Sequence, residues 1–256
     1  MDLINSKTTF VTSWFNIYNE KIYNDKTEEW RFEQFDTILK TGILICIYVS
    51  EDMYDKINSL FGKYENLKIM PPMKLSDTVS HKFYYAIKDG LEKEGQEITL
   101  PPVTHSIKDT VEYMILMNAK IEFVHDAVTK NPWGSDYFAW IDFSIAYLLR
   151  DKPRSLSLLK MLSMQRFHSP FFAIPGCIGK LDDNSDDERR TLGALLERPF
   201  WRFCGSFFIG DKQSIEDFYI TYFENFLDFL KEHKRMIWEV NYWGWLEGIG
   251  KWSPNW

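Results

Sequence analysis

The 256 residues of the chain are enough for one large domain with a sizeable core, because 45% of them are apolar and 26% are charged. The net charge of −7 argues against a general nucleic-acid-binding protein, whose surface would be basic. No apolar run approaches the ~18 residues of a membrane span and the N-terminus lacks a signal-peptide layout, so we expect a cytoplasmic protein without a transmembrane segment.

The first seventy residues alternate between strand and helix patterns. TTFVTSWF (8–15) is rich in β-branched and aromatic residues and predicts a strand. Thr27 is placed to cap a helix, and GILICIYVS (42–50) is a near-continuous apolar run, typical of a parallel strand covered on both faces. A short helical segment leads to a third strand at NLKIM (66–70). This order predicts an α/β fold with a parallel sheet.

The middle of the chain continues the pattern. Ser106 opens a predicted helix with an apolar stripe at 3.6-residue spacing, and this helix runs into NAKIEFVHDAVTKNPWG (118–134). The sheet resumes at YFAWIDFSI (137–145).

The last third contains two strand-like stretches, FFAIPG (171–176) and RFCGSFFIG (202–210), and one strongly patterned helix. Ser214 begins that helix, with Asp217 in the position of a capping box, and we assign its aromatic stripe to the core. Because repeats and linkers are absent, we expect a single domain over residues 1–256.

Familiar catalytic motifs are missing: there is no GxGxxG, Walker loop, GxSxG or HExxH. The five histidines are scattered, none at ligand spacing from another. The three cysteines are far apart without CxxC spacing, which favours buried thiols in a reducing compartment over a structural zinc site.

Asp142 is the unusual residue, because it lies inside the apolar stretch FAWIDFSIA (138–146). An unpaired buried carboxylate is costly, so it requires a cation, hydrogen bonds or a strand end that faces a cleft. At the carboxyl end of a parallel strand it is placed to bind Mg²⁺ or Mn²⁺ together with a substrate diphosphate. The alternative is that Asp142 caps the next segment or pairs with a buried Arg or Lys.

Asn118 and Lys120 form a second unusual group at the end of an apolar helix face. An amide and an ammonium in this place are suited to ribose and phosphate oxygens. The alternative is a helix C-cap with a lysine that compensates the helix dipole.

Four segments resemble the HtrL/YibB (WlaTC-type) family of glycosyltransferases: TTFVTSWFNI, NAKIEFVHDAVTKNPWGSDYFAWIDFSIA, GSFFIG and WEVNYW. The resemblance spans almost the whole chain in the same order. It implies a GT-A-type fold, with a Rossmann-like nucleotide-sugar-binding half at about 1–145 and an acceptor-binding half at about 146–256. It also implies a nucleotide-sugar as donor and a divalent metal, Mn²⁺ or Mg²⁺, as cofactor. We expect the donor to be a UDP-sugar and the acceptor to be a glycan or another hydroxyl.

The resemblance also implies roles for single residues. Donor-binding residues would be Thr9, Thr12, Trp14, Asn118, Lys120 and Trp140, together with Gly205 and Ser206, where the backbone could approach the acceptor or donor sugar closely. Asp142 would be a catalytic and metal-binding acid of a DxD-like element. Here Trp140 replaces the first acid of that element, so a single carboxylate would hold the metal. No Asp-His pair follows residue 245, where the resemblance implies a further metal-binding pair.

Glu239 is a carboxylate among aromatic residues, and it is our candidate for acceptor contact or general-base catalysis. The alternative is an exposed acid on a short helix. The nearby Trp238, Tyr242, Trp243 and Trp245 are candidates for stacking on a sugar, although some must be packing residues.

Three functions are therefore compared. A glycosyltransferase is the first, and a noncatalytic nucleotide- or sugar-binding protein is the second, motivated by the incomplete DxD and the missing late histidine. A sugar-phosphate nucleotidyltransferase is the third, and we discount it because SWFNIYNEKIY (13–23) contains no glycine for a phosphate loop.

Overall fold

The computed structural model describes residues 6–17, 26–105, 108–168, 170–180 and 191–254. A six-stranded sheet with the order β3-β2-β1-β4-β6-β5 forms its centre. The strands are β1 (Thr8–Trp14), β2 (Leu44–Val49), β3 (Leu67–Ile69), β4 (Tyr137–Ile141), β5 (Phe172–Ala173) and β6 (Phe207–Asp211). Strands β1 to β4 are parallel, whereas β6 runs antiparallel to β4 and β5. The predicted α/β class with a mostly parallel sheet is confirmed.

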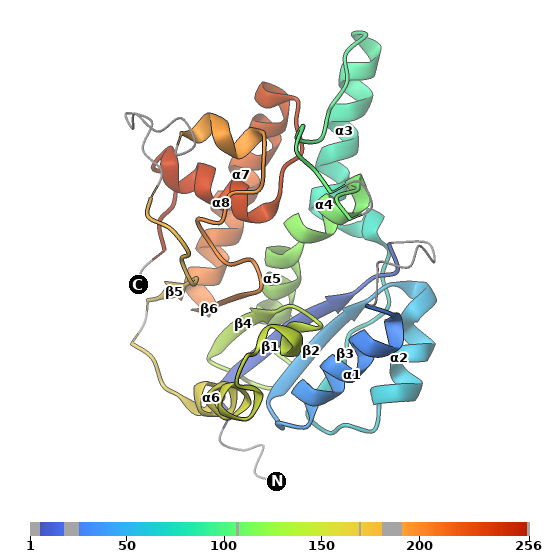
Figure 1. Ribbon diagram of the computed structural model, residues 1–256, viewed down its shortest axis with the longest axis vertical. Coiled ribbons are helices and arrows are strands. Elements are labelled where there is room, and N and C mark those ends of the chain that lie inside the picture. The colour runs from blue at the N-terminus through green and yellow to red at the C-terminus, as the bar shows by residue number, and fades with distance from the viewer. Residues whose placement is uncertain (1–5, 18–25, 106–107, 169, 181–190, 255–256) are drawn as a thin grey trace.

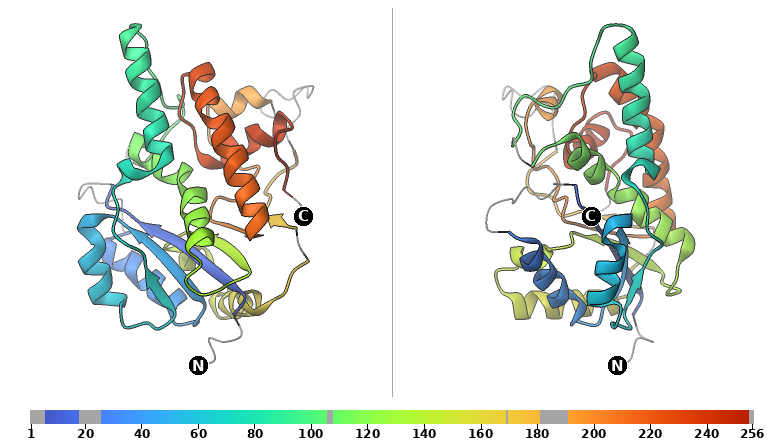
Figure 2. Two further views of the ribbon diagram at one scale, coloured as in Figure 1. Left: turned by 180° about the vertical axis from the view of Figure 1, so that it is seen from behind. Right: turned by 90° about the vertical axis from the view of Figure 1, so that its right-hand side faces the viewer.

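Helices cover both faces of the sheet (Figures 1 and 2). Successive strand residues point to opposite faces of the sheet and enter two apolar clusters. Val11 and Cys46 lie in the first cluster, and Phe10 and Ile45 lie in the second. The first cluster is completed by α3 (Val79–Lys93), α4 (Val111–Asn118), α5 (Lys120–Lys130), α7 (Lys212–His233) and α8 (Glu239–Gly248). The second is completed by α1 (Glu28–Leu39), α2 (Tyr54–Phe61) and α6 (Lys152–Met164). The protein is therefore a three-layer α/β/α structure.

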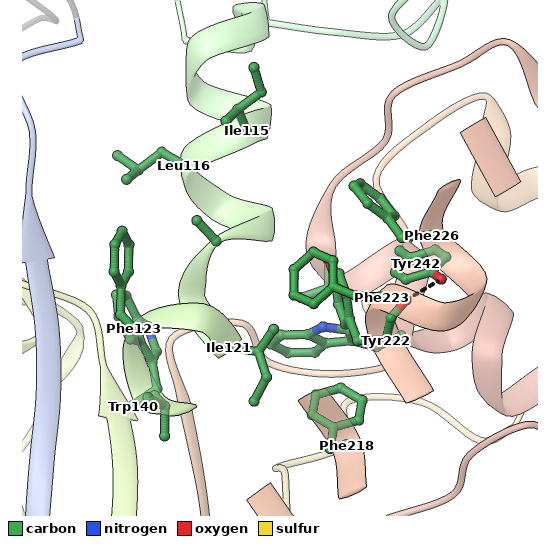
Figure 3. Packing of buried hydrophobic residues seen from close by; sticks show 14 of the residues in the cluster. Ile115, Leu116, Ile121, Phe123, Trp140, Phe218, Tyr222, Phe223, Phe226 and Tyr242 are labelled. Atoms are coloured by element: carbon green, nitrogen blue, oxygen red, sulfur yellow. Dashed lines mark hydrogen bonds between the residues drawn. The ribbon is translucent and has the colours of Figure 1, made fainter. Parts of the chain in front are cut away.

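Aromatic side chains fill the larger cluster (Figure 3). Phe123 of α5 stacks over Trp140 with ring centroids 6.3 Å apart. Phe218 and Tyr222 of α7 pack against α8, where the Tyr242 hydroxyl donates to the Tyr222 carbonyl. The prediction that the aromatic stripe of this helix is core is confirmed.

Two of the predicted helix starts can be compared with the structure. The Thr27 side chain accepts a hydrogen bond from the Trp30 amide, so the predicted cap of α1 is confirmed. The predicted capping box at Ser214 is wrong, because α7 begins at Lys212 and the Asp211 carboxylate accepts from the Ser214 amide at 2.9 Å.

The start of α4 differs from the prediction as well. It begins at Val111 after the cap Thr110, and the predicted opening residues Ser106 and Ile107 lie outside the described residues. The chain then bends at Ala119, so the stretch that was expected to be one helix forms α4 and α5.

Segments from both predicted halves of the chain share each layer. Helix α5, from the first half, packs on α7 from the second. Helix α6, from the second half, lies on the same sheet face as α1. The assignment of residues 1–145 to the donor and 146–256 to the acceptor stays a prediction.

Two expectations from composition can be compared with the structure. Among the described residues, no helix is long and apolar enough to cross a membrane. The expectation of buried thiols holds for Cys46 but is wrong for Cys177, which is exposed, while Cys204 is half-buried.

Candidate functional site

A pocket of about 260 Å³ opens at the carboxyl ends of β1 and β4. This edge of a parallel sheet is where ligands bind in open α/β folds, because the loops after neighbouring strands meet there. Its lining comes from the chain after β1, the start of α1, helix α4 and the 3-10 helix η4 (Ile145–Leu148): Ser13, Trp14, Phe15, Asn16, Ile17, Lys26, Arg31, Lys108, Tyr113, Leu116, Met117, Trp140, Asp142, Phe143, Ser144, Tyr147 and Leu148. The pocket is thus walled by aromatic and apolar side chains with a few charged groups, the usual composition of a small-molecule site.

Three half-buried cations belong to this lining. The Lys26 ammonium lies 4.1 Å from the centre of the Tyr147 ring, and the Lys108 ammonium lies 4.8 Å from that of Tyr113. The guanidinium of Arg31 lies 5.9 Å from the centre of the Trp14 ring. Within the described part of the chain, none of the three forms an ion pair with a carboxylate. Their positive charge is therefore available to an anionic ligand.

Asp142 is the acid of the pocket, and it is held by a buried ammonium. Lys120, the first residue of α5, is 2% exposed. Its ammonium donates to the Gly205 carbonyl at 2.8 Å and to Glu239 Oε1 at 2.8 Å, and it lies 3.1 Å from Asp142 Oδ1. These three acceptors use all three protons of the ammonium, so Lys120 joins β4, α5, α8 and the segment before β6 at one point.

The charge of this cluster is set by its two carboxylates. Burial by itself lowers the pKa of the Lys120 ammonium, but the charges and hydrogen bonds of Asp142 and Glu239 outweigh burial, so that this pKa lies above its ordinary value. Lys120 is consequently protonated at neutral pH. One ammonium between two carboxylates leaves one net negative charge, which Asp142 presents to the pocket because its side chain is 36% exposed.

Trp140 explains the incomplete acidic motif. Its indole Nε1 donates to Asp142 Oδ1 at 2.8 Å, so the residue that replaces the first acid fixes the orientation of the second. Oδ1 already accepts from the Trp140 indole and contacts the Lys120 ammonium, so Oδ2 is the oxygen left for a ligand. The two open alternatives for Asp142 are therefore combined: it pairs with a buried lysine and it also faces a cleft.

The described residues fit a resident divalent metal poorly. They contain no group of three or more His, Cys, Asp or Glu side chains that could hold an ion. Asp142 would supply a single oxygen, and Lys120 places a positive charge on the same carboxylate. Mn²⁺ or Mg²⁺ as cofactor stays a prediction from the resemblance.

Three residues expected at the nucleoside lie away from the pocket. The Thr9 hydroxyl donates to Ser135 Oγ at the opposite edge of the sheet, and Thr12 is fully buried in β1. The Asn118 amide is fully buried and donates to the carbonyls of Met114 and Ile237, while its oxygen accepts from Tyr222. Their placement is that of core residues, whereas Trp14 and Trp140 do line the pocket.

Gly205, Ser206 and Glu239 are placed around Lys120 rather than in the pocket lining. A Cβ at Gly205 would overlap the Glu239 carboxylate and lie 2.8 Å from Val240 Cγ1, so the glycine permits a close approach to α8. The Ser206 carbonyl accepts from the Asp142 amide at 3.1 Å. Glu239 is 5% exposed, and its role as a general base stays a prediction.

The aromatic residues around Glu239 are mainly packing residues. Trp238, Tyr242 and Trp243 are at most 6% exposed, and Trp245 packs partly buried against the same cluster. The Trp238 indole donates to Asp109 at 3.3 Å. Among the described residues, none of these four rings lines the pocket.

Sequence reasoning missed the three pocket cations. Lys26 and Arg31 flank the start of α1, the first helix after β1, and Lys108 precedes α4. Nothing in residue type or periodicity marks them. The usable signal was positional: loops that follow adjacent parallel strands meet at one edge, and the start of α1 is one of those places.

Solved structures with distant similarity of fold include the apo form of mouse xyloside xylosyltransferase 1. It has 6% sequence identity, covers 93% of this chain and 81% of that one, and has a TM-score of 0.43. No curated protein sequence matches the chain. The family model described as a bacterial protein of unknown function (HtrL_YibB) matches residues 6–235. The chain therefore belongs to the HtrL_YibB family.

Proposed function

We propose that the protein is a glycosyltransferase of the GT-A type that moves a sugar from a nucleotide-diphosphate sugar, with UDP as the nucleotide, to a hydroxyl of a glycan or another acceptor. The observation that carries the proposal is the composition of the pocket after β1 and β4. It combines aromatic walls, three cations without carboxylate partners in the described residues, and one fixed acid.

Each part of the pocket matches one part of such a donor. Aromatic rings such as Trp14 and Tyr113 offer surfaces for a nucleobase. Lys26, Arg31 and Lys108 offer charge to a diphosphate. The carboxylate of Asp142 offers an acceptor to a sugar hydroxyl, and a nucleotide-sugar contains all three chemical groups.

The reaction would proceed by displacement at the anomeric carbon of the donor sugar. The acceptor oxygen forms a bond to that carbon, the bond from the carbon to the diphosphate oxygen breaks, and the diphosphate leaves with the bonding electrons. The acceptor proton passes to a base or to the departing diphosphate. Cations of the pocket stabilise the negative charge that develops on the leaving group, which is electrostatic catalysis.

Asp142 has the position of an orienting group in this scheme. Because Trp140 and Lys120 fix Oδ1, the remaining oxygen has a defined direction before any ligand arrives. A fixed acceptor that binds a sugar hydroxyl holds the anomeric carbon near the acceptor oxygen, and such positioning contributes to rate.

The test is donor consumption by the purified chain. Nucleotide-sugars of UDP, GDP and CDP are incubated with simple sugars as acceptors, and the released nucleoside diphosphate is measured for the wild type and Asp142→Asn. The proposal expects release with one nucleotide class and a loss of at least about 100-fold in the variant. Equal release by both proteins, or none with any donor that binds, would contradict it.

A noncatalytic nucleotide- or sugar-binding protein is the second candidate. It is favoured by the burial of Glu239, because among the described lining residues Asp142 is the only carboxylate. Such a protein would bind the same donor but release no nucleoside diphosphate from it, so the same assay separates the two functions.

A further inference from the structure

We infer that this pocket binds a nucleoside diphosphate without a divalent metal, because Lys26, Arg31 and Lys108 provide the positive charge and one oxygen of Asp142 is already bound by Trp140 and Lys120. The inference deepens the proposed function, since it rests on the pocket being the donor site and assigns the groups that bind its diphosphate.

The Asp142 carboxylate is already partly occupied by protein donors. One of its two oxygens already accepts the Trp140 indole and lies 3.1 Å from the Lys120 ammonium. A metal ion on the other oxygen would lie a few ångströms from that ammonium, and the two like charges would repel. The ammonium cannot move away easily, because its other two acceptors are Gly205 and Glu239 in the protein interior.

A divalent metal ion would find few protein ligands among the described residues of the pocket. The pocket lining in the described residues contains no histidine or cysteine and no carboxylate besides Asp142. Magnesium accepts one or two carboxylates only when phosphates and water complete its shell. Here the same phosphates have three protein cations to contact.

Aromatic rings hold the three pocket cations in place. Lys26 and Lys108 each lie over a tyrosine ring of the pocket, and Arg31 lies beside Trp14. Aromatic contacts of this kind keep a cationic side chain close to one surface and thereby reduce the ordering needed on binding. Since none of the three has an ion-pair partner in the described residues, contact with a diphosphate breaks no salt bridge of the part of the chain that the structure describes.

The experiment is calorimetric titration of the full chain with UDP, GDP and CDP, in EDTA and in MnCl₂. The nucleotide that binds best is then titrated into Arg31→Gln and Lys108→Gln. Lys63→Gln is the matched control, because Lys63 also lies over a ring, that of Tyr64 at 5.8 Å, but does not line the pocket. The charge-conserving Lys108→Arg and a thermal melt of each protein without ligand show that the fold is intact.

We expect dissociation constants in EDTA and MnCl₂ to agree within about threefold. Arg31→Gln and Lys108→Gln each weaken binding in EDTA by roughly tenfold or more, the effect of losing a charged hydrogen bond, and Lys63→Gln changes it less than about twofold. Asp142→Asn retains or improves the affinity in EDTA, because it removes a negative charge near the diphosphate.

The contrary outcomes are distinct. Binding that requires manganese and is lost in Asp142→Asn would overturn the inference and leave the proposed function standing. Binding in EDTA that is unaffected by both charge-removing variants would also overturn it, because the diphosphate would then lie elsewhere. No binding of any nucleotide in either buffer would overturn the inference and the proposed donor together.

Discussion

The two groups of cations at the pocket differ in how their charge is satisfied. Lys120 is buried and has three acceptors from three separate segments, so its charge is fully used by the protein. Lys26, Arg31 and Lys108 are half-buried, lie against aromatic rings, and have no carboxylate partner in the described residues. The buried lysine therefore fixes the architecture of the site, while the half-buried cations are left for a ligand.

Removal of the Lys120 charge should produce the largest effect. Lys120→Met leaves Glu239 buried without a cation, and the loss of one partner of a buried pair destabilises a fold by about 3–5 kcal/mol. Urea denaturation measures this change. The double variant Lys120→Met/Glu239→Gln should recover part of the stability, and an equal loss in both proteins would contradict the role given to the ion pair. Removal of the Arg31 charge should leave the free energy of unfolding within about 0.5 kcal/mol.

Neutralisation of Asp142 should lower the transfer activity strongly but change the free energy of unfolding little. Asp142→Asn retains an oxygen that can accept from Trp140 and Lys120, so we expect a change in stability below about 1 kcal/mol. Transfer activity should fall by about 100-fold, equivalent to about 2.7 kcal/mol in the barrier. Donor consumption and urea denaturation of the same preparation measure both quantities. A variant that unfolds but retains its activity per folded molecule would reverse the assignment.

A methyl group at Gly205 should disturb the buried surroundings of Lys120 but not the half-buried cations of the pocket. Gly205→Ala forces a Cβ against Glu239 and Val240, and overpacking of this kind costs about 1–3 kcal/mol. Gly90→Ala in α3 is the matched control, because a Cβ there meets no atom within 4 Å and should be neutral or stabilising by about 0.5–1 kcal/mol. Thermal melts of the two variants check the difference, and similar melting temperatures would show that Gly205 is not needed for close packing.

Cys46 should give the smallest effect, because burial is the main cause of the pKa shift of its thiol, whereas the pKa of Lys120 is raised by two carboxylates. Burial raises the pKa of its thiol from about 9 to about 12. Between these values the folded protein keeps the proton that the unfolded chain releases, so the free energy of unfolding falls as pH rises, by about 1.4 kcal/mol per pH unit. Above pH 12 both states are deprotonated and this contribution stops changing.

The test is the slope of stability against pH from 9 to 11. Cys46→Ala should be less stable at every pH because of the cavity, but its slope should be smaller by about 1.4 kcal/mol per pH unit than that of the wild type. Cys177→Ala, which removes an exposed thiol, is the comparison protein. An unchanged slope in Cys46→Ala would show that the thiol does not titrate with unfolding.

The local elements were readable from the sequence, because their information is local. Thr27 before a helix and the β-branched run after Lys7 specify α1 and β1 from a few neighbouring residues. Asp142 was detectable as a charge in an apolar strand. Start positions failed where two caps compete, as at Asp211 and Ser214, since sequence alone does not show which side chain reaches the free amides.

The architecture of the site was not readable in the same way. Lys120 meets Glu239 across 119 positions of sequence, and the pair forms only because the first residues of α5 and α8 meet near the end of β4. Asn118 looked available for a ligand, yet Tyr222 and the Ile237 carbonyl use its amide from distant segments. No local sequence pattern marks Lys26, Arg31 and Lys108. They meet in one pocket only because the chain topology brings the segment after β1 and the segment before α4 together.

The most direct test of the donor site is a crystal structure of the chain soaked with UDP or with the nucleotide that binds best. We predict that the base lies against Trp14 or Tyr113 and that the diphosphate lies within hydrogen-bond distance of Arg31 or Lys108. Nucleotide density at another place on the molecule, with this pocket empty, would contradict the assignment of the pocket as the donor site.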